Sequence, residues 1–188
     1  LSRHQASDNK VAFSQTVDWG LRWVLLVAFP AAIGLGLMAG PLIVTLFMYK
    51  AGRFDVTDAL MTRKALWAYA PGVLGFMLAK VLASAYYACQ DIKTPVKIAM
   101  ATVAVNILGN LALVSTFAHQ GLAMATSLSA LFNAATLGII LLRRQMIEPE
   151  PGWGQYTLRL LASGFSMIAG LLLISPALPT WIAWSTPE

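Results

Sequence analysis

Charged residues are scarce in this sequence. Its 188 residues include 13 lysines and arginines and 8 aspartates and glutamates, which together make 11% of the chain. An ordinary soluble domain is about 25% charged, whereas 58% of this chain is hydrophobic. So few polar side chains cannot cover a water-soluble core, which excludes an ordinary soluble domain.

Residues that commonly carry out chemistry are also few. The single cysteine, Cys89, excludes a disulfide within the chain, and the two histidines, His4 and His119, lie far apart in the sequence. There is no Ser/His/Asp arrangement, HExxH motif or phosphate-binding glycine loop. We therefore predict no enzyme activity, no cofactor and no metal site built from such residues. The net charge of +5 suits contact with anionic membrane lipids, and no soluble basic face remains to bind nucleic acid.

The hydrophobic residues gather into five long runs. A helix needs about 20 apolar residues to cross the hydrocarbon core of a bilayer, and each run is long enough. None alternates like an outer-membrane β-strand. The sequence predicts an all-α integral membrane protein with five transmembrane helices, at about 21–49, 65–88, 96–117, 121–143 and 157–175. Residues 1–20 are predicted to form a cytoplasmic loop with an amphipathic stretch leading into the first span.

The loops between the runs indicate an orientation. Lysines and arginines concentrate in cytoplasmic loops, and here one side carries twice as many as the other. That side holds Arg3, Lys10, Arg22, Lys93, Lys97, Arg143, Arg144 and Arg159, and the opposite side holds Lys50, Arg53, Arg63 and Lys64. The N-terminus and the loops at 88–97 and 143–159 are therefore predicted to be cytoplasmic.

Several stretches resemble a known family. "YYACQDIKTPVKIAM" at 86–100, "VDWGLR" at 17–22, "AGPLIVTLF" at 39–47, "TDALMTRKAL" at 57–66 and "PGW" at 151–153 are similar to segments of the MurJ (MviN) lipid II flippases. These belong to the multidrug, oligosaccharidyl-lipid and polysaccharide exporter superfamily. The resemblance covers nearly the whole chain. It implies a fourteen-helix, two-lobe transporter, of which this single transmembrane region, 1–188, corresponds to the C-terminal portion, about helices nine to thirteen.

The resemblance also implies a function. The family flips lipid II, the undecaprenyl-pyrophosphate-linked peptidoglycan precursor, from the cytoplasmic to the periplasmic leaflet of the bacterial inner membrane by alternating access. Two alternatives stay open: export of another polysaccharide-lipid or a drug by the same superfamily, and a non-transporting membrane scaffold. The expected partners are lipid II, membrane lipids and proteins of cell-wall synthesis. The family's principal cavity arginines are expected in helices outside this chain.

One charged residue interrupts the second span. Lys80 lies about 15 residues into it, where a charge is costly and by default faces the bundle interior or a water-filled cavity. Lys80 is thus a candidate for the substrate cavity. The alternative is that its long side chain extends to the interface and carries no function.

The polar stretch between the second and third spans gives a second set of candidates. Gln90, Asp91 and Lys93 are candidates for a cytoplasmic gate or for binding the substrate headgroup. The alternative is that the stretch mainly starts the third helix, with Thr94 as the N-cap and Pro95 at the first helical position.

Amides and hydroxyls inside the third and fourth spans give a third set. Asn106 and Asn110 share one helix face, and Thr126 lies on the polar face of the next helix. Their oxygens could coordinate Na⁺, which would fit a transport cycle driven by Na⁺ or by the membrane potential, as proposed for the family. The alternative is hydrogen bonding between the helices.

Overall fold

The computed structural model describes residues 2–48, 56–117, 119–148 and 150–174. Five helices in these ranges are long and apolar enough to cross a membrane, which confirms the number of spans. The helices are α1 (Ser2–Leu37), α3 (Val56–Ala88), α4 (Lys93–Phe117), α5 (His119–Arg143) and α6 (Trp153–Ile174), with a short α2 (Ala39–Ile43) and a π-helical turn at Val44–Met48 between α1 and α3.

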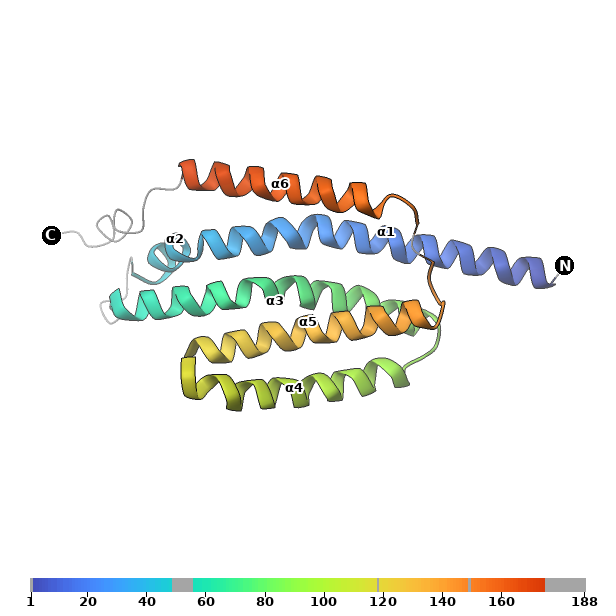
Figure 1. The fold of residues 1–188 in the computed structure, drawn as a ribbon, viewed down its shortest axis with the longest axis horizontal. Helices are drawn as coiled ribbons and strands as arrows, with labels where there is room; N and C mark the ends of the chain where they lie inside the picture. The colour runs from blue at the N-terminus through green and yellow to red at the C-terminus, as the bar shows by residue number, and fades with distance from the viewer. Residues whose placement is uncertain (1, 49–55, 118, 149, 175–188) are drawn as a thin grey trace.

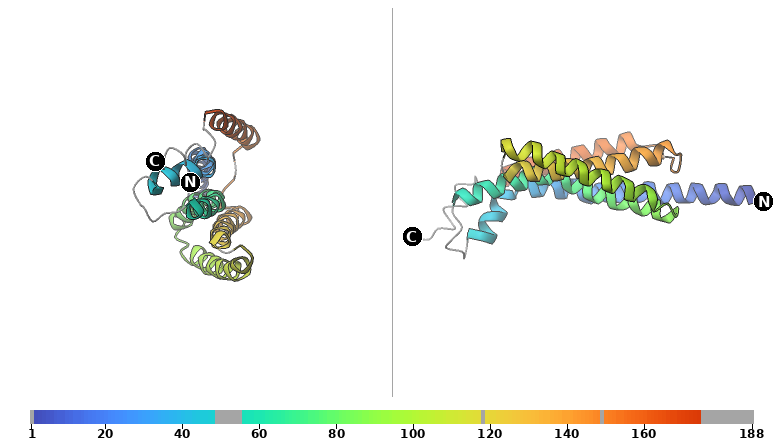
Figure 2. Two further views of the ribbon diagram at one scale, coloured as in Figure 1. Left: turned by 90° about the vertical axis from the view of Figure 1, so that its left-hand side faces the viewer. Right: turned by 90° about the horizontal axis from the view of Figure 1, so that it is seen from below.

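The long helices run antiparallel in chain order and stand side by side as a curved row (Figures 1 and 2). The spatial order is α6, α1, α3, α5, α4, with contacts between each neighbouring pair. One end of the bundle, which we call the loop end, holds the start of α1 and the loop residues 89–92, 144–148 and 150–152 (Figure 1). The opposite end holds α2, the end of α4 and the start of α5.

The first helix differs from its prediction at both ends. Residues 2–20, expected to include a loop, are helical and continuous with the span, because no proline or glycine interrupts the chain before Gly20. The helix then ends at Leu37, whereas the predicted span continued to residue 49, which lies outside the described residues. Pro41 explains the break: it has no N–H, and its ring would clash with the carbonyl of Leu37.

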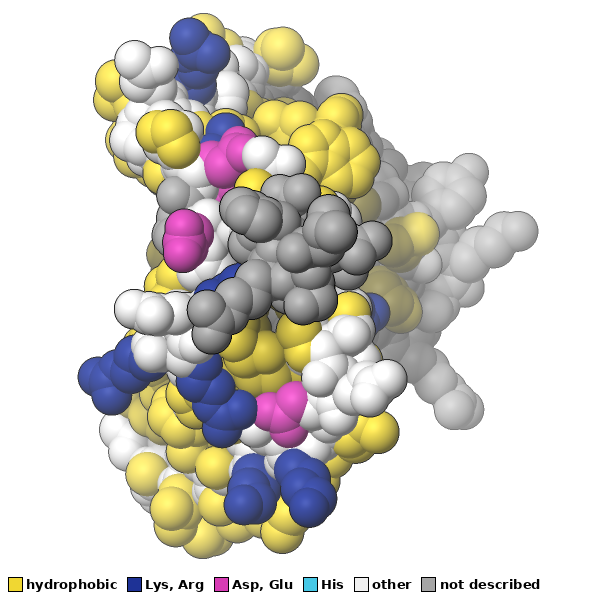
Figure 3. All heavy atoms as spheres, turned by 90° about the vertical axis from the view of Figure 1, so that its right-hand side faces the viewer, with side chains coloured by type: hydrophobic (Ala, Val, Ile, Leu, Met, Phe, Trp, Pro, Cys, Tyr) yellow, Lys and Arg dark blue, Asp and Glu magenta, His cyan; other side chains and the backbone are white. Residues whose placement is uncertain are grey.

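The 36 residues of α1 correspond to about 54 Å of helix, whereas the hydrocarbon core is about 30 Å thick. The N-terminal part of α1 accordingly extends beyond the other helices (Figure 1). Viewed from that end, the molecule carries lysine, arginine and acidic side chains (Figure 3).

Helices α3 and α5 pack closely because α3 presents glycines to α5. A Cβ added at Gly75 would lie 2.6 Å from the backbone of Ala130, and one at Gly72 would lie 2.7 Å from the hydroxyl of Ser127. Toward the loop end the two helices share a core that includes Tyr86, which is fully buried and donates a hydrogen bond to the Leu137 carbonyl at 2.9 Å.

Candidate functional site

The ends of α3 and α5 are built alike at the loop end. Gln90 and Gln145 adopt positive φ angles of 59° and 50°. At each end the glutamine N–H bonds to the carbonyl three residues back, and the next N–H bonds to the carbonyl five residues back. This is the Schellman arrangement, whose left-handed position glycine usually occupies. Each helix is therefore terminated by a glutamine in a strained left-handed conformation, which lies two residues after the last helical residue.

Asp91, which follows the first glutamine, joins the two loops. Its carboxylate accepts hydrogen bonds from the Thr94 hydroxyl at 2.6 Å and the Thr94 backbone N–H at 3.1 Å, and it forms an ion pair with Arg144 at 2.8 Å. The bonds from Thr94, aided by Arg144, hold the pKa of Asp91 below its usual value. Asp91 thus caps the first turn of α4 and fastens it to the end of α5.

A second polar cluster joins α1 to α6. Asp18 is only 5% exposed and accepts a hydrogen bond from the indole N–H of Trp153 at 2.6 Å. The Nε of Arg22 lies 2.8 Å from the other Asp18 oxygen, an ion-pair contact without hydrogen-bond alignment. The Arg22 guanidinium lies 5.4 Å from the centre of the Trp153 ring, and the Tyr156 hydroxyl donates to the Arg22 carbonyl. We call Asp18, Arg22, Trp153 and Tyr156 the α1–α6 junction.

The loop that leads into α6 is fixed to α1 one turn earlier. The Ser14 hydroxyl donates to the Glu148 carbonyl at 2.9 Å and accepts from the Glu148 N–H at 2.8 Å. Because Ser14 and Asp18 are four residues apart on one helix face, they hold the loop and the start of α6 together.

Polar side chains also connect α4 and α5 at mid-helix. The Asn106 amide donates to the Ser129 hydroxyl at 3.1 Å, and Asn110 donates to the Asn106 oxygen at 3.1 Å. The Oδ1 atom of Asn110 is buried and has no hydrogen-bond partner among the described residues. The network therefore links α4 to α5, but it leaves the Asn110 oxygen without a hydrogen-bond partner among the described residues.

Comparison with known proteins identifies the family. The sequence model described as "Lipid II flippase MurJ" matches residues 1–187. The chain belongs to the MurJ family. The lipid II flippase MurJ of Burkholderia cenocepacia is 38% identical over 172 residues, covering 92% of this chain and 33% of that protein. The probable lipid II flippase MurJ of Vibrio cholerae is 36% identical over 190 residues, covering 100% of this chain and 35% of that protein.

The fold agrees with a solved MurJ structure. A lipid II flippase MurJ in an inward closed conformation superposes with a TM-score of 0.75 at 21% identity, covering 92% of this chain and 36% of that one. This chain thus spans about a third of the length of the MurJ relatives that it matches. The all-α membrane architecture and the family resemblance are both confirmed.

The structure brings some of the candidate residues of this MurJ-family chain together and separates others. Gln90 and Asp91 are adjacent in one ordered turn, while Lys93, at the start of α4, is exposed. Thr94 does not cap the helix as expected, because the Asp91 carboxylate occupies that role. Lys80 is exposed on α3, and no ion pair involves it within the described part of the chain.

The third candidate set is only partly assembled. Asn106 and Asn110 are in contact within α4. The bond from Asn106 to Ser129 of α5 agrees with the helix-linking alternative. The Thr126 hydroxyl instead donates to the Leu122 carbonyl of its own helix at 2.8 Å. Whether these residues bind an ion stays a prediction.

The sequence did not predict the α1–α6 junction, the contacts between Ser14 and Glu148, or the pairing of Asp91 with Arg144. The sequence carried a signal for the junction, because "VDWGLR" and "PGW" were among the stretches that resemble the family. Their pairing could not be inferred, since Asp18 and Trp153 are 135 positions apart.

Proposed function

We propose that this chain is the C-terminal portion, about helices nine to thirteen, of a lipid II flippase in the bacterial inner membrane. The match of the MurJ family model to residues 1–187 carries the proposal. The N-terminus and the loop end would face the cytoplasm, as the distribution of lysines and arginines favours. Lipid II is flipped without breaking a bond, so the protein would act as a transporter rather than a catalyst.

Within such a flippase, α3, α4 and α5 would move as one body. The contacts of Gly72 and Gly75, the buried Tyr86 hydrogen bond and the Asp91–Arg144 ion pair support this assignment. Alternating access moves packed units against one another. The unit formed by α3, α4 and α5 has the close packing that such a movement needs.

Lys80 would attract the pyrophosphate of the substrate or pair with an acid elsewhere in the longer protein. Its exposure on α3 leaves its ammonium group available for either role. An ammonium group within a membrane-spanning helix is expected to face protein or water rather than lipid.

The Asn106 and Asn110 oxygens would contribute to a Na⁺ site that couples the cycle to an ion gradient. The buried, unpartnered Oδ1 of Asn110 supports this role, since Na⁺ is a hard cation that suits oxygen ligands. Thr126 would have to rotate away from the Leu122 carbonyl to join them. We expect Na⁺ to raise the thermal stability of the protein, and Asn110→Leu to remove this increase. Asn133→Leu, which replaces another buried unpartnered amide oxygen, should leave it; an equal loss in both variants would contradict the site.

The test of the proposed function uses the protein at its full natural length in cells depleted of their resident lipid II flippase. The unaltered protein is expected to sustain growth, and Lys80→Ala is expected to cause lysis at normal membrane abundance. Lys97→Ala, which removes an exposed lysine near the loop end, serves as the matched control. Failure of the unaltered protein to sustain growth would refute the proposal, whereas growth with Lys80→Ala would remove only the role of Lys80.

A further inference from the structure

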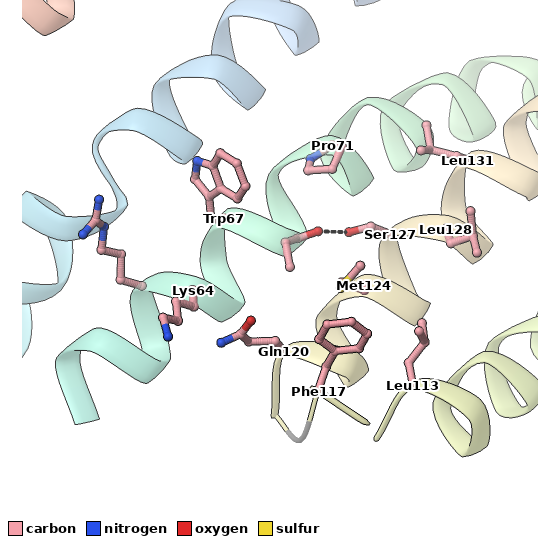
Figure 4. Close-up of a pocket in the computed structure, with 12 residues that line it drawn as sticks. Lys64, Trp67, Pro71, Leu113, Phe117, Gln120, Met124, Ser127, Leu128 and Leu131 are labelled. Carbon is pink, nitrogen blue, oxygen red and sulfur yellow. Dashed lines mark hydrogen bonds between the residues drawn. The ribbon is translucent and has the colours of Figure 1, made fainter. Parts of the chain in front are cut away.

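A large groove lies between α3, α4 and α5 at the end of the bundle opposite the loop end (Figure 4). Its volume of about 830 Å³ falls within the range of about 300–1,000 Å³ that is typical of small-molecule sites. Its walls are mostly apolar side chains from α4 and α5, including Leu113, Phe117, Met124 and Leu128.

The rim of the groove is cationic. Arg63 and Lys64 are both exposed and line the groove at its mouth on α3. The Gln120 amide, at the start of α5, points toward Lys64 (Figure 4). None of the described residues that line the groove is acidic. The groove therefore offers positive charge and hydrogen-bond donors at one end and hydrocarbon along the rest.

The cations lie at the level of the membrane interface. The candidate span of α3, Thr57–Ala88, contains both cations near its start. Its charge-free stretch begins after Lys64 and continues to Lys80. Trp67, one turn further into the span and 68% exposed, is of the type enriched at headgroup level. The polar groups deeper in the groove need no ligand, because the Ser127 hydroxyl donates to the Ala68 carbonyl at 2.7 Å.

We propose that this groove binds an anionic phospholipid of the adjoining leaflet. The phosphate would lie between Arg63, Lys64 and Gln120, and an acyl chain would lie along Leu113, Phe117 and Met124. A free phosphate ion would leave the apolar walls unused. A zwitterionic lipid would match poorly two cations that have no ion-pair partner among the described residues. This lipid is a resident of the membrane and is distinct from the transported substrate.

The fluorescence of Trp67 gives a direct test, because this side chain lines the groove. The protein at its full natural length is placed in phosphatidylcholine vesicles containing a minor fraction of brominated phosphatidylglycerol or of brominated phosphatidylcholine. Subtracting the signal of Trp67→Phe isolates quenching at Trp67. Two interfacial cations predict a preference for phosphatidylglycerol of roughly ten- to thirtyfold in apparent affinity.

Matched variants locate the preference. Neutralising both rim cations (Arg63→Gln with Lys64→Gln) should reduce quenching by phosphatidylglycerol to the level of phosphatidylcholine. Neutralising Lys97 and Arg143, which are exposed and lie toward the loop end, should leave the preference unchanged.

Four results would overturn the proposal. Equal quenching by the two lipids would exclude selection by charge, and quenching by neither would mean that another part of the longer protein fills the groove. Displacement of brominated phosphatidylglycerol by undecaprenyl pyrophosphate would make the groove a substrate site, and displacement by inorganic phosphate would make it an ion site. None of these results depends on whether the protein flips lipid II.

Discussion

Gly75→Ala tests the close packing of α3 against α5. The added Cβ would lie 2.6 Å from the carbonyl carbon of Ala130 and the nitrogen of Leu131, and 2.8 Å from the Ala130 oxygen. All three are backbone atoms of a helix, so no side chain can rotate to make room. Since ordinary contact begins at 3.4 Å, the two helices must separate by roughly 1 Å.

The size of the effect follows from two opposing terms. Overpacking a well-packed interface costs about 1–3 kcal/mol, whereas replacing glycine by alanine inside a helix gains about 1 kcal/mol. Gly75→Ala should therefore be destabilising by about 0–2 kcal/mol. Gly170 in α6 provides the matched control, because a Cβ there meets nothing within 4 Å. Gly170→Ala should show only the gain, so the two variants should differ by about 1–3 kcal/mol.

The assay is thermal unfolding of the purified protein in detergent, followed by the fraction that stays monodisperse after heating. Gly75→Ala should unfold at a lower temperature than Gly170→Ala, and Gly170→Ala at the same temperature as the unaltered protein or a higher one. Equal shifts in the two variants would refute the close approach of α3 and α5.

Three further predictions concern the loop end. The folded pKa of Asp91 lies below its usual value, so its cap on α4 should be intact above about pH 4 and lost as the pH falls through the folded pKa. Hydrogen exchange of the first turn of α4 would show this loss, and Asp91→Asn should remove the pH dependence. Gln90→Gly should raise the free energy of unfolding by about 1 kcal/mol, because Gln90 has a φ of 59°. Gln15→Gly, inside α1, should lower the free energy of unfolding by a similar amount, and thermal unfolding would distinguish the two variants. Trp153→Phe leaves the buried Asp18 without its indole partner. This loss should lower the free energy of unfolding by about 1–3 kcal/mol and speed proteolysis of the loop before α6. An unchanged cleavage rate would contradict a stabilising role for the α1–α6 junction.

The number and approximate place of the spans could be predicted because long apolar runs have few alternatives to a membrane helix. The helix ends were harder to predict. Charged residues such as Asp58 and Arg63 mark where hydrocarbon ends, not where helix ends, so α3 begins nine residues before its predicted start at 65. The break at Met38 depends on Pro41, whose effect is local and does not alter hydrophobicity.

The candidate site was predictable only where it depends on neighbouring residues. Asn106 and Asn110 are four positions apart, so their contact follows from helical periodicity. The pairs Asp91–Arg144 and Asp18–Trp153 join segments separated by 53 and 135 positions, and nothing in a single sequence indicates which distant residues meet. The left-handed conformation of Gln90 and Gln145 was also unforeseen, because glycine is the residue that normally indicates it.

The most direct test of the central claim measures where lipid II resides. Cells depleted of their resident flippase would express the protein at its full natural length, and an enzyme that cleaves lipid II would be added from the periplasmic side. The proposed function predicts that lipid II becomes accessible to this enzyme. If lipid II stayed protected while the protein was abundant in the membrane, the assignment as a lipid II flippase would be wrong.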